Sequence, residues 1–423
     1  MVPWVHLFVS QYGTVAPCCL APWEKELALG DVNSASVDEI WNGARMREFR
    51  RNMLQDKKDK RCWQCHSNEA NGLRSKRKLT NFLYLEKFDW VKQTEDDGSC
   101  EASKPVYFDI RLSNLCNFKC RICGHHSSSS WFEDAQALGT VAHAQKINRG
   151  IDDLDGFLAQ FEALVPGLEE VYFAGGEPLI MPEHYRILDL LAAHGKFDVK
   201  LRYNTNFSLM QYKDRNLFEL WDRFDDVFLH ASLDGSGPRG EFQRKGQDWA
   251  AVLQSRQRML DLCPRVDFML TPTISVFSVL HLPDFHREWT EKGLIGIEEL
   301  IPHTLKNPAA YDIRVLPPDM KRQVAEKTDA HIAWITANAD RYRRSRKREA
   351  PPEFNLIRPP EVTGNPQLDM SINEFRNAVT YMCSTDESHL LPKFREMCAE
   401  LDALRGENTL AVFPELAPMF ETS

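Results

Sequence analysis

The alternation of apolar and polar positions changes along the chain. Between residues 105 and 305, short apolar runs alternate with longer amphipathic stretches. Apolar runs separated by helical patterns predict parallel strands joined by crossover helices. Six strands are predicted, at residues 106–112, 168–174, 199–203, 227–231, 266–270 and 295–300. The pattern therefore indicates a unit of the α/β class.

The first eighty residues follow a different pattern. Residues 4–9 and 15–19 form two apolar runs around a Gly-containing turn, which predicts a β-hairpin. Ser36 and Glu39 have the spacing of a capping box, and a helix is predicted from there through Met53. We expect a small hairpin-and-helix module ahead of the α/β unit.

The last hundred residues are first Pro-rich and then amphipathic, with a helix predicted over residues 371–406. Cys383 and Cys398 are expected to be buried structural thiols. The predicted boundaries are an N-terminal module at 1–80, a polar linker at 81–104, the α/β unit at 105–305 and a Pro-rich and helical C-terminal extension at 306–423.

Composition narrows the class of protein. Of the 423 residues, 43% are apolar and 27% charged, which is typical of a globular protein with a large core. No apolar run approaches eighteen residues and the start lacks a basic n-region, so we expect a cytoplasmic protein without membrane spans. The net charge of −9 argues against general nucleic-acid binding.

Three cysteines follow the first predicted strand of the α/β unit. Cys116, Cys120 and Cys123 are spaced by four and three residues. Three thiolates of this kind can hold three irons of a [4Fe–4S] cluster, which leaves one iron open to a small molecule. The alternatives are a zinc site, with His125 or His126 as fourth ligand, and a chance cluster of cysteines.

The second predicted strand ends in Gly175-Gly176-Glu177-Pro178. Two glycines let the backbone approach a ligand closely, and a carboxylate there can accept hydrogen bonds from an ammonium group. A tight turn before a helix is the alternative explanation of these four residues taken alone.

A second cysteine cluster lies in the N-terminal module. Cys18 and Cys19 end the predicted hairpin, and Cys62 and Cys65 form a Cys-x-x-Cys pair further along. Two such pairs can meet around one metal ion, and zinc is the default interpretation of this spacing.

Together, the cysteine motif and the Gly-Gly-Glu-Pro motif resemble the radical S-adenosylmethionine (SAM) superfamily in type, order and spacing. The resemblance implies a partial (β/α)6 TIM-type barrel that is open on one side. It also implies that Cys116, Cys120 and Cys123 hold a [4Fe–4S] cluster with an open iron site.

The same resemblance implies which residues bind SAM. Small polar residues recur where predicted strands end, which is where barrel enzymes place their active sites. For each one alone, a capping or turn role is an equally good explanation. The expected SAM-binding residues are Ile122, Gly175, Gly176, Glu177, Pro178, Asn204, Asn206 and Ser232.

The N-terminal module resembles the SPASM/twitch modules of radical SAM enzymes, which bind an auxiliary iron–sulfur cluster. The resemblance rests on Gly13 before Cys18, on the stretches 39–42 and 49–50, and on the pair Cys62 and Cys65. The module precedes the barrel here, whereas it usually follows it, and no cysteine precedes the hairpin. The implied ligands are Cys18, Cys62 and Cys65, and the fourth ligand is Cys19, His6 or a non-protein group.

Family resemblance implies reductive cleavage of SAM to a 5′-deoxyadenosyl radical, with electrons from a reductant such as flavodoxin or ferredoxin. With the auxiliary cluster as electron acceptor, we expect oxidative modification of a peptide or a small polar metabolite. One alternative is a redox-neutral epimerase, in which a cysteine such as Cys263 or Cys383 returns a hydrogen atom. The other is a non-catalytic metal-binding interaction protein.

Overall fold

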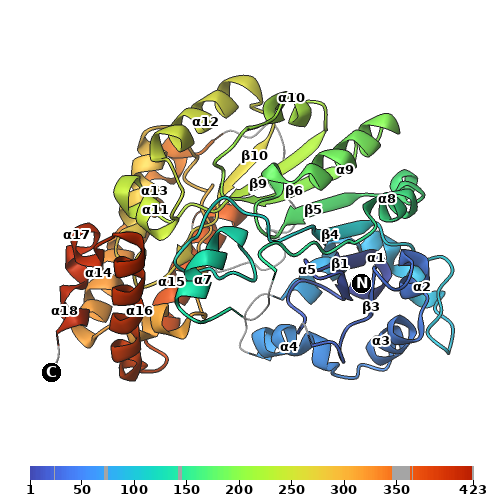
Figure 1. Cartoon of the computed structure of the whole chain (residues 1–423), viewed down its shortest axis with the longest axis horizontal. Coiled ribbons are helices and arrows are strands. Elements are labelled where there is room, and N and C mark those ends of the chain that lie inside the picture. Colours follow the sequence, from blue (N-terminus) through green and yellow to red (C-terminus); the bar gives the residue numbers. More distant parts are fainter. Residues whose placement is uncertain (23, 71–74, 142–144, 345–362, 364, 422–423) are drawn as a thin grey trace. The chain divides into compact units, whose positions relative to one another are not determined.

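The computed structural model describes residues 1–22, 24–70, 75–141, 145–344, 363 and 365–421 (Figure 1). The chain divides into two compact units. The first comprises Met1–Cys116, Gln145–Asn204 and Gln211–Phe228, and the second Asn117–Ala144, Thr205–Met210 and Leu229–Ser423. Much of the Pro-rich segment, at residues 345–362, lies outside the described residues. No helix of the described residues has the length and apolarity that crossing a bilayer requires.

The predicted N-terminal hairpin is confirmed, and it continues the sheet of the first unit. Its strands are β1 (His6–Val9) and β2 (Thr14–Ala16), and β3 (Gly30–Asp31) pairs with β2. A helical turn, α1 (Val2–Val5), precedes β1, so the strand begins two residues later than predicted. β1 pairs in parallel with β4 (Tyr107–Arg111), in the register His6↔Tyr107. Strands a hundred residues apart in sequence therefore lie side by side.

The predicted capping box is present, but the helix that follows it is broken. The Ser36 side chain accepts a hydrogen bond from the Glu39 amide at 3.2 Å and begins α2 (Val37–Trp41). Gly43 separates α2 from α3 (Ala44–Leu54). The module continues through η1 (Lys60–Cys62), α4 (Trp63–Ala70), α5 (Lys76–Leu83), η2 (Leu85–Lys87) and α6 (Phe88–Lys92).

Five of the six strands predicted for the α/β region are formed. They are β4, β5 (Glu170–Ala174), β6 (Lys200–Thr205), β9 (Asp226–Ala231) and β10 (Asp267–Leu270), in an eight-stranded sheet of order β10-β9-β6-β5-β4-β1-β2-β3. The sixth prediction, residues 295–300, is wrong, because this stretch contributes only the isolated bridge Leu270↔Leu300. The eight-stranded sheet is parallel where its pairing is given from β1 to β6 and antiparallel at β2 and β3, and no closed barrel is detected among the described strands.

One face of the sheet in the first unit packs against helices. α8 (Leu154–Glu162), α9 (Pro182–Ala193) and α10 (Leu217–Trp221) follow β-strands in the chain (Figure 1). Aromatic contacts join strands to helices, with ring centroids 5.2 Å apart for Phe108 and Phe161 and 4.8 Å apart for Phe173 and His184. Alternate residues of β4 and β5 thus supply this core, as the period of two requires.

The helical C-terminal extension is confirmed. Its helices are α14 (Pro318–Tyr342), α15 (Pro366–Met382), α16 (Leu391–Arg405), α17 (Thr409–Val412) and α18 (Ala417–Phe420). The predicted helix at 371–406 is interrupted after α15, which leaves Cys383 exposed, whereas Cys398 is buried as predicted.

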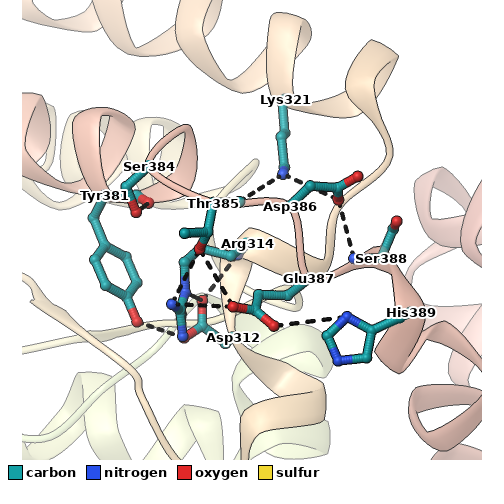
Figure 2. A network of polar contacts seen from close by, with 10 residues as sticks. All are labelled: Asp312, Arg314, Lys321, Tyr381, Ser384, Thr385, Asp386, Glu387, Ser388 and His389. Carbon is teal, nitrogen blue, oxygen red and sulfur yellow. Dashed lines mark hydrogen bonds and ion pairs between the residues drawn. The ribbon is translucent and has the colours of Figure 1, made fainter.

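A polar network supports the break after α15 (Figure 2). Asp312 is fully buried, accepts a hydrogen bond from Tyr381 Oη at 2.6 Å and pairs with Arg314 at 2.9 Å. Arg314 also lies 3.4 Å from Glu387, which belongs to the connection between the two helices. One buried carboxylate therefore fixes the connection.

Candidate functional site

The cysteine motif occupies the loop after β4, as predicted. Ser113 starts the loop: its Oγ donates to the Asn148 carbonyl at 2.8 Å and accepts from the Leu115 amide at 3.0 Å. Cys116 is half-buried and is the last residue of this segment of the first unit.

Cys120 and Cys123 belong to the second unit and lie on one turn, since the Cys123 amide donates to the Cys120 carbonyl at 3.0 Å. Trp131 Nε1 donates to the same carbonyl at 2.7 Å. Burial, and then the charge of Cys120, raise the pKa of the Cys123 thiol to about 12. Such thiols need a strong Lewis acid to hold them as thiolates at neutral pH, which fits metal or cluster ligation.

The Gly-Gly-Glu turn follows β5 in the first unit and is hydrogen-bonded to the start of the cysteine loop. The Gly176 amide donates to the Ser113 carbonyl at 3.1 Å, and the Glu177 amide donates to the Leu115 carbonyl at 2.8 Å. A Cβ at Gly176 would lie 2.2 Å from the Leu115 carbonyl oxygen, so the close approach requires glycine. The turn and the stretch that leads into Cys116 are therefore built as one structure.

Glu177 is buried, and its carboxylate accepts from the Leu179 amide at 3.1 Å, capping η5 (Pro178–Ile180). The alternative explanation of residues 175–178, a tight turn before a helix, therefore accounts for part of their role. Receiving the methionine amine of SAM stays a prediction for Gly175, Gly176 and Glu177.

The remaining expected SAM-binding residues are dispersed. In the second unit, Asn206 donates to the Asn117 side chain at 2.9 Å, next to the cysteine motif. The Ser232 amide donates to the Thr205 carbonyl at 2.8 Å, and Ser232 is half-buried. Asn204, in the first unit, is exposed.

Asn206 is therefore hydrogen-bonded to the cysteine loop. Ile122, within the motif, is half-buried. The expected contact of its backbone with adenine stays a prediction.

Three cysteines of the N-terminal module face one cavity. Cys18, Cys62 and Cys65 line a cavity of about 240 Å³ in the first unit. Burial is the main cause that raises the pKa values of Cys18 and Cys62, the latter to about 12. Within the described residues, no three His, Cys, Asp or Glu side chains are arranged as ligands of a single metal ion. Three thiols around one cavity nevertheless fit an iron–sulfur cluster, which takes thiolate ligands.

The two protein candidates for the fourth ligand, Cys19 and His6, do not line this cavity. Cys19 Sγ lies 3.9 Å from Lys76 Nζ. His6 is fully buried, with Nδ1 2.7 Å from the Pro17 carbonyl and Nε2 3.8 Å from Asp109. Their role as ligands stays a prediction.

A buried polar cluster on β4 was not predicted. Asp109 lies 3.6 Å from Lys76 and 3.1 Å from Arg111, and Lys76 also donates to Tyr107 at 3.2 Å. Burial alone would raise the pKa of Asp109, but Arg111, His6 and Lys76 outweigh it and hold that pKa well below its usual range. The sequence contains one signal for this cluster: Tyr107, Asp109 and Arg111 alternate with apolar residues, which places all three side chains on one face of the sheet.

Comparison with known families agrees with this arrangement. Residues 110–273 match the model of the radical SAM superfamily, and residues 1–66 match that of SPASM, an iron–sulfur cluster-binding domain. The chain therefore contains a radical SAM domain and, on its N-terminal side, a SPASM domain. These domains imply a [4Fe–4S] cluster, SAM and auxiliary iron–sulfur binding.

Individual relatives are distant. The chain is 22% identical over 184 residues to 7,8-dihydro-6-hydroxymethylpterin dimethyltransferase of Methanocaldococcus jannaschii; this covers 42% of the chain and 32% of the relative. The chain thus spans about a third of that protein's length.

Among solved structures, anSMEcpe with bound AdoMet is similar over 57% of this chain and 63% of its own, with 17% identity and a TM-score of 0.40. Streptococcus suis SuiB bound to precursor peptide SuiA is similar over 60% of this chain and 51% of its own, with 16% identity and a TM-score of 0.37.

Proposed function

We propose that this protein is a radical SAM enzyme that cleaves SAM reductively and oxidatively modifies a peptide or a small polar metabolite. One observation carries the proposal: the Gly-Gly-Glu turn is hydrogen-bonded to residues 113–115, directly before the first cysteine of the motif. This local geometry suits a cofactor that contacts both the cysteine loop and the glycine turn.

In the proposed arrangement, Cys116, Cys120 and Cys123 hold the [4Fe–4S] cluster. When bound, the reduced cluster and SAM supply a 5′-deoxyadenosyl radical that abstracts a hydrogen atom from the substrate. Gly175 and Gly176 let the backbone approach the amino-acid part of SAM without side-chain obstruction. Asn206 and Ser232 are the proposed polar contacts at the ends of strands.

Cys18, Cys62 and Cys65 would hold the auxiliary cluster in the SPASM domain. Its proposed role is to accept an electron from the substrate, which makes the net reaction an oxidation. The cavity that the three thiols line supports this assignment. A reductant such as flavodoxin or ferredoxin would supply the first electron.

Metal content and SAM cleavage test the proposal together. Anaerobic reconstitution should give about eight iron and eight sulfide per chain if both clusters are of the [4Fe–4S] type. Cys120→Ala should lose about half of the iron and abolish release of 5′-deoxyadenosine under dithionite. Cys62→Ala should also lose about half of the iron but retain the release. Cys383→Ala, at an exposed thiol, is the matched control.

Three results would contradict parts of the proposal. No 5′-deoxyadenosine from the fully reconstituted protein would exclude the radical reaction and support an interaction protein. About four iron and one zinc per chain would exclude the electron-acceptor role. Solvent deuterium at a product carbon, with activity surviving Cys62→Ala, would support the redox-neutral alternative.

A further inference from the structure

A segment from a distant part of the sequence runs along the cysteine motif in the second unit. It follows α11 (Gly237–Gln243) and leads to α12 (Trp249–Leu262). The Arg121 amide donates to the Gln243 carbonyl at 2.8 Å, and the Lys119 amide donates to the Lys245 carbonyl at 2.9 Å. Cys120 therefore lies between two backbone hydrogen bonds, opposite Arg244.

The close approach of the two segments is enforced by Gly246. Its φ is +109°, and a Cβ there would lie 2.9 Å from the Asn117 carbonyl oxygen. A glycine at this position can adopt the positive φ and leaves room for the cysteine loop. The backbone therefore fixes which side chain faces the loop.

The side chain of Arg244 is held on one side by a carboxylate. Its Nε and Nη2 lie 2.8 Å and 3.0 Å from the two oxygens of Asp234. Asp234 is itself buried and accepts from the Thr273 amide at 2.7 Å. Nη2 donates a hydrogen bond to Asp234 and Nε lies at ion-pair distance from the other oxygen, so the carboxylate restrains the guanidinium group on this side.

The remaining edge of the guanidinium group faces a cysteine of the motif. Arg244 Nη1 lies 3.9 Å from Cys120 Sγ, within the range of a hydrogen bond to sulfur. A guanidinium group is protonated at any pH that a protein tolerates, and the ion pair with Asp234 favours the charged form further. Arg244 therefore presents a permanent donor to the sulfur.

We propose that Arg244, oriented by Asp234, donates to the sulfur of Cys120 and raises the reduction potential of the cluster that Cys120 holds. Arg244 is a positioning residue that acts through the cysteine, and the inference rests on the proposed function of that cysteine. Reduction adds negative charge to a cluster, and hydrogen bonds to the ligand sulfurs are among the factors that set its potential. A donor at the sulfur stabilises the reduced state more than the oxidised state.

A potentiometric titration followed by electron paramagnetic resonance tests the inference on the reconstituted full chain. The relevant signal is the one that changes when SAM is added. Arg244→Met should move its midpoint potential to a more negative value. Arg244→Lys, which keeps a charged donor, should move it less. Arg239→Gln is the matched control, since Arg239 lies on α11 and pairs with Glu415 instead.

A kinetic comparison adds a second measurement. Arg244→Met should release 5′-deoxyadenosine more slowly with a weak reductant, and a strong reductant should restore most of the rate. A merely structural role would lower both rates alike. An unchanged potential in Arg244→Met with full iron content would overturn the inference.

Asp234→Asn tests the orienting role of Asp234 separately. This variant retains Arg244 and Cys120 but weakens the pairing that orients the guanidinium group. Its potential should lie between those of the wild type and Arg244→Met, and a wild-type value would count against the orienting role. If Cys120→Ala keeps all of its iron, the proposed function itself is wrong, whatever Arg244 does.

Discussion

Arg121, inside the cysteine motif, connects that motif to the C-terminal extension within the second unit. Its side chain is fully buried and pairs with Asp402 and, at 2.8 Å, with Glu407. Its guanidinium carbon lies 3.8 Å from the centre of the Phe242 ring. We predict that Arg121→Met substantially destabilises the protein, because it leaves the Asp402 carboxylate without its cation.

The magnitude follows from the burial of the partners. The side chains of Asp402 and Glu407 are 19% and 10% exposed, and Glu407 keeps a second cation, Lys245, at 2.8 Å. Breaking a buried ion pair by removing one partner costs about 3–5 kcal/mol. Because Asp402 retains partial contact with water, we expect about 3 kcal/mol for Arg121→Met.

The assay is guanidinium chloride unfolding of the anaerobic protein, with the loss in free energy of unfolding taken from the midpoint and slope. The double variant Arg121→Met/Asp402→Asn should recover much of the loss, since no uncompensated charge remains. Lys393→Met is the control, because it removes an exposed pair with Glu396 and should cost less than about 1 kcal/mol.

Two results would refute this reasoning. One is an Arg121→Met variant within about 1 kcal/mol of the wild type, since breaking a largely buried pair costs more than that. The other is a double variant no more stable than the single one, which would point to lost packing on Phe242 rather than to the buried charge.

Three further predictions concern other buried polar groups. Burial lowers the pKa of His286 to about 4 and is the main cause that lowers the pKa of His331 to about 2. The unfolded state therefore binds more protons than the folded state below about pH 6.5, so the free energy of unfolding falls as the pH drops from there toward 4. Unfolding curves of His331→Gln should show a smaller fall over the same pH range. Tyr381→Phe removes a hydrogen-bond donor to the buried carboxylate of Asp312 (Figure 2), so thermal unfolding should show a free energy of unfolding lower by about 2 kcal/mol. Lys76→Met removes a cation from the buried carboxylate of Asp109, and denaturant unfolding should show a free energy of unfolding lower by about 3 kcal/mol. An unchanged free energy of unfolding would indicate that Arg111 alone is enough to balance the carboxylate.

Local sequence signals predicted the elements that depend on neighbouring residues. The capping box at Ser36 and the strand at 106–112 were found from patterns a few residues long. The predicted strand at 295–300 was not formed, although its apolar residues are buried, because burial of an apolar run does not require pairing into a sheet. The hydrophobic pattern alone does not distinguish a paired strand from a buried apolar segment without strand pairing.

The buried charges near the cysteines were not predicted. Lys76 and Asp109 are brought together by packing of α5 against a strand more than thirty residues away. Arg244 and Arg121 find their carboxylates at positions that no spacing rule relates to the cysteine motif. Polar residues of this kind look like ordinary surface positions in a sequence.

The sequence by itself determined which families the chain resembles and where the cysteine loop and the Gly-Gly-Glu turn lie, because each of these motifs is short and is recognised from the spacing of nearby residues. Only the tertiary structure decided which distant groups surround them: the hairpin that extends the sheet beside β4, the arginine facing Cys120, and the carboxylates that hold Arg121. The physical reason is that electrostatic partners are chosen by proximity after folding, and proximity between remote segments leaves no periodic trace in the chain.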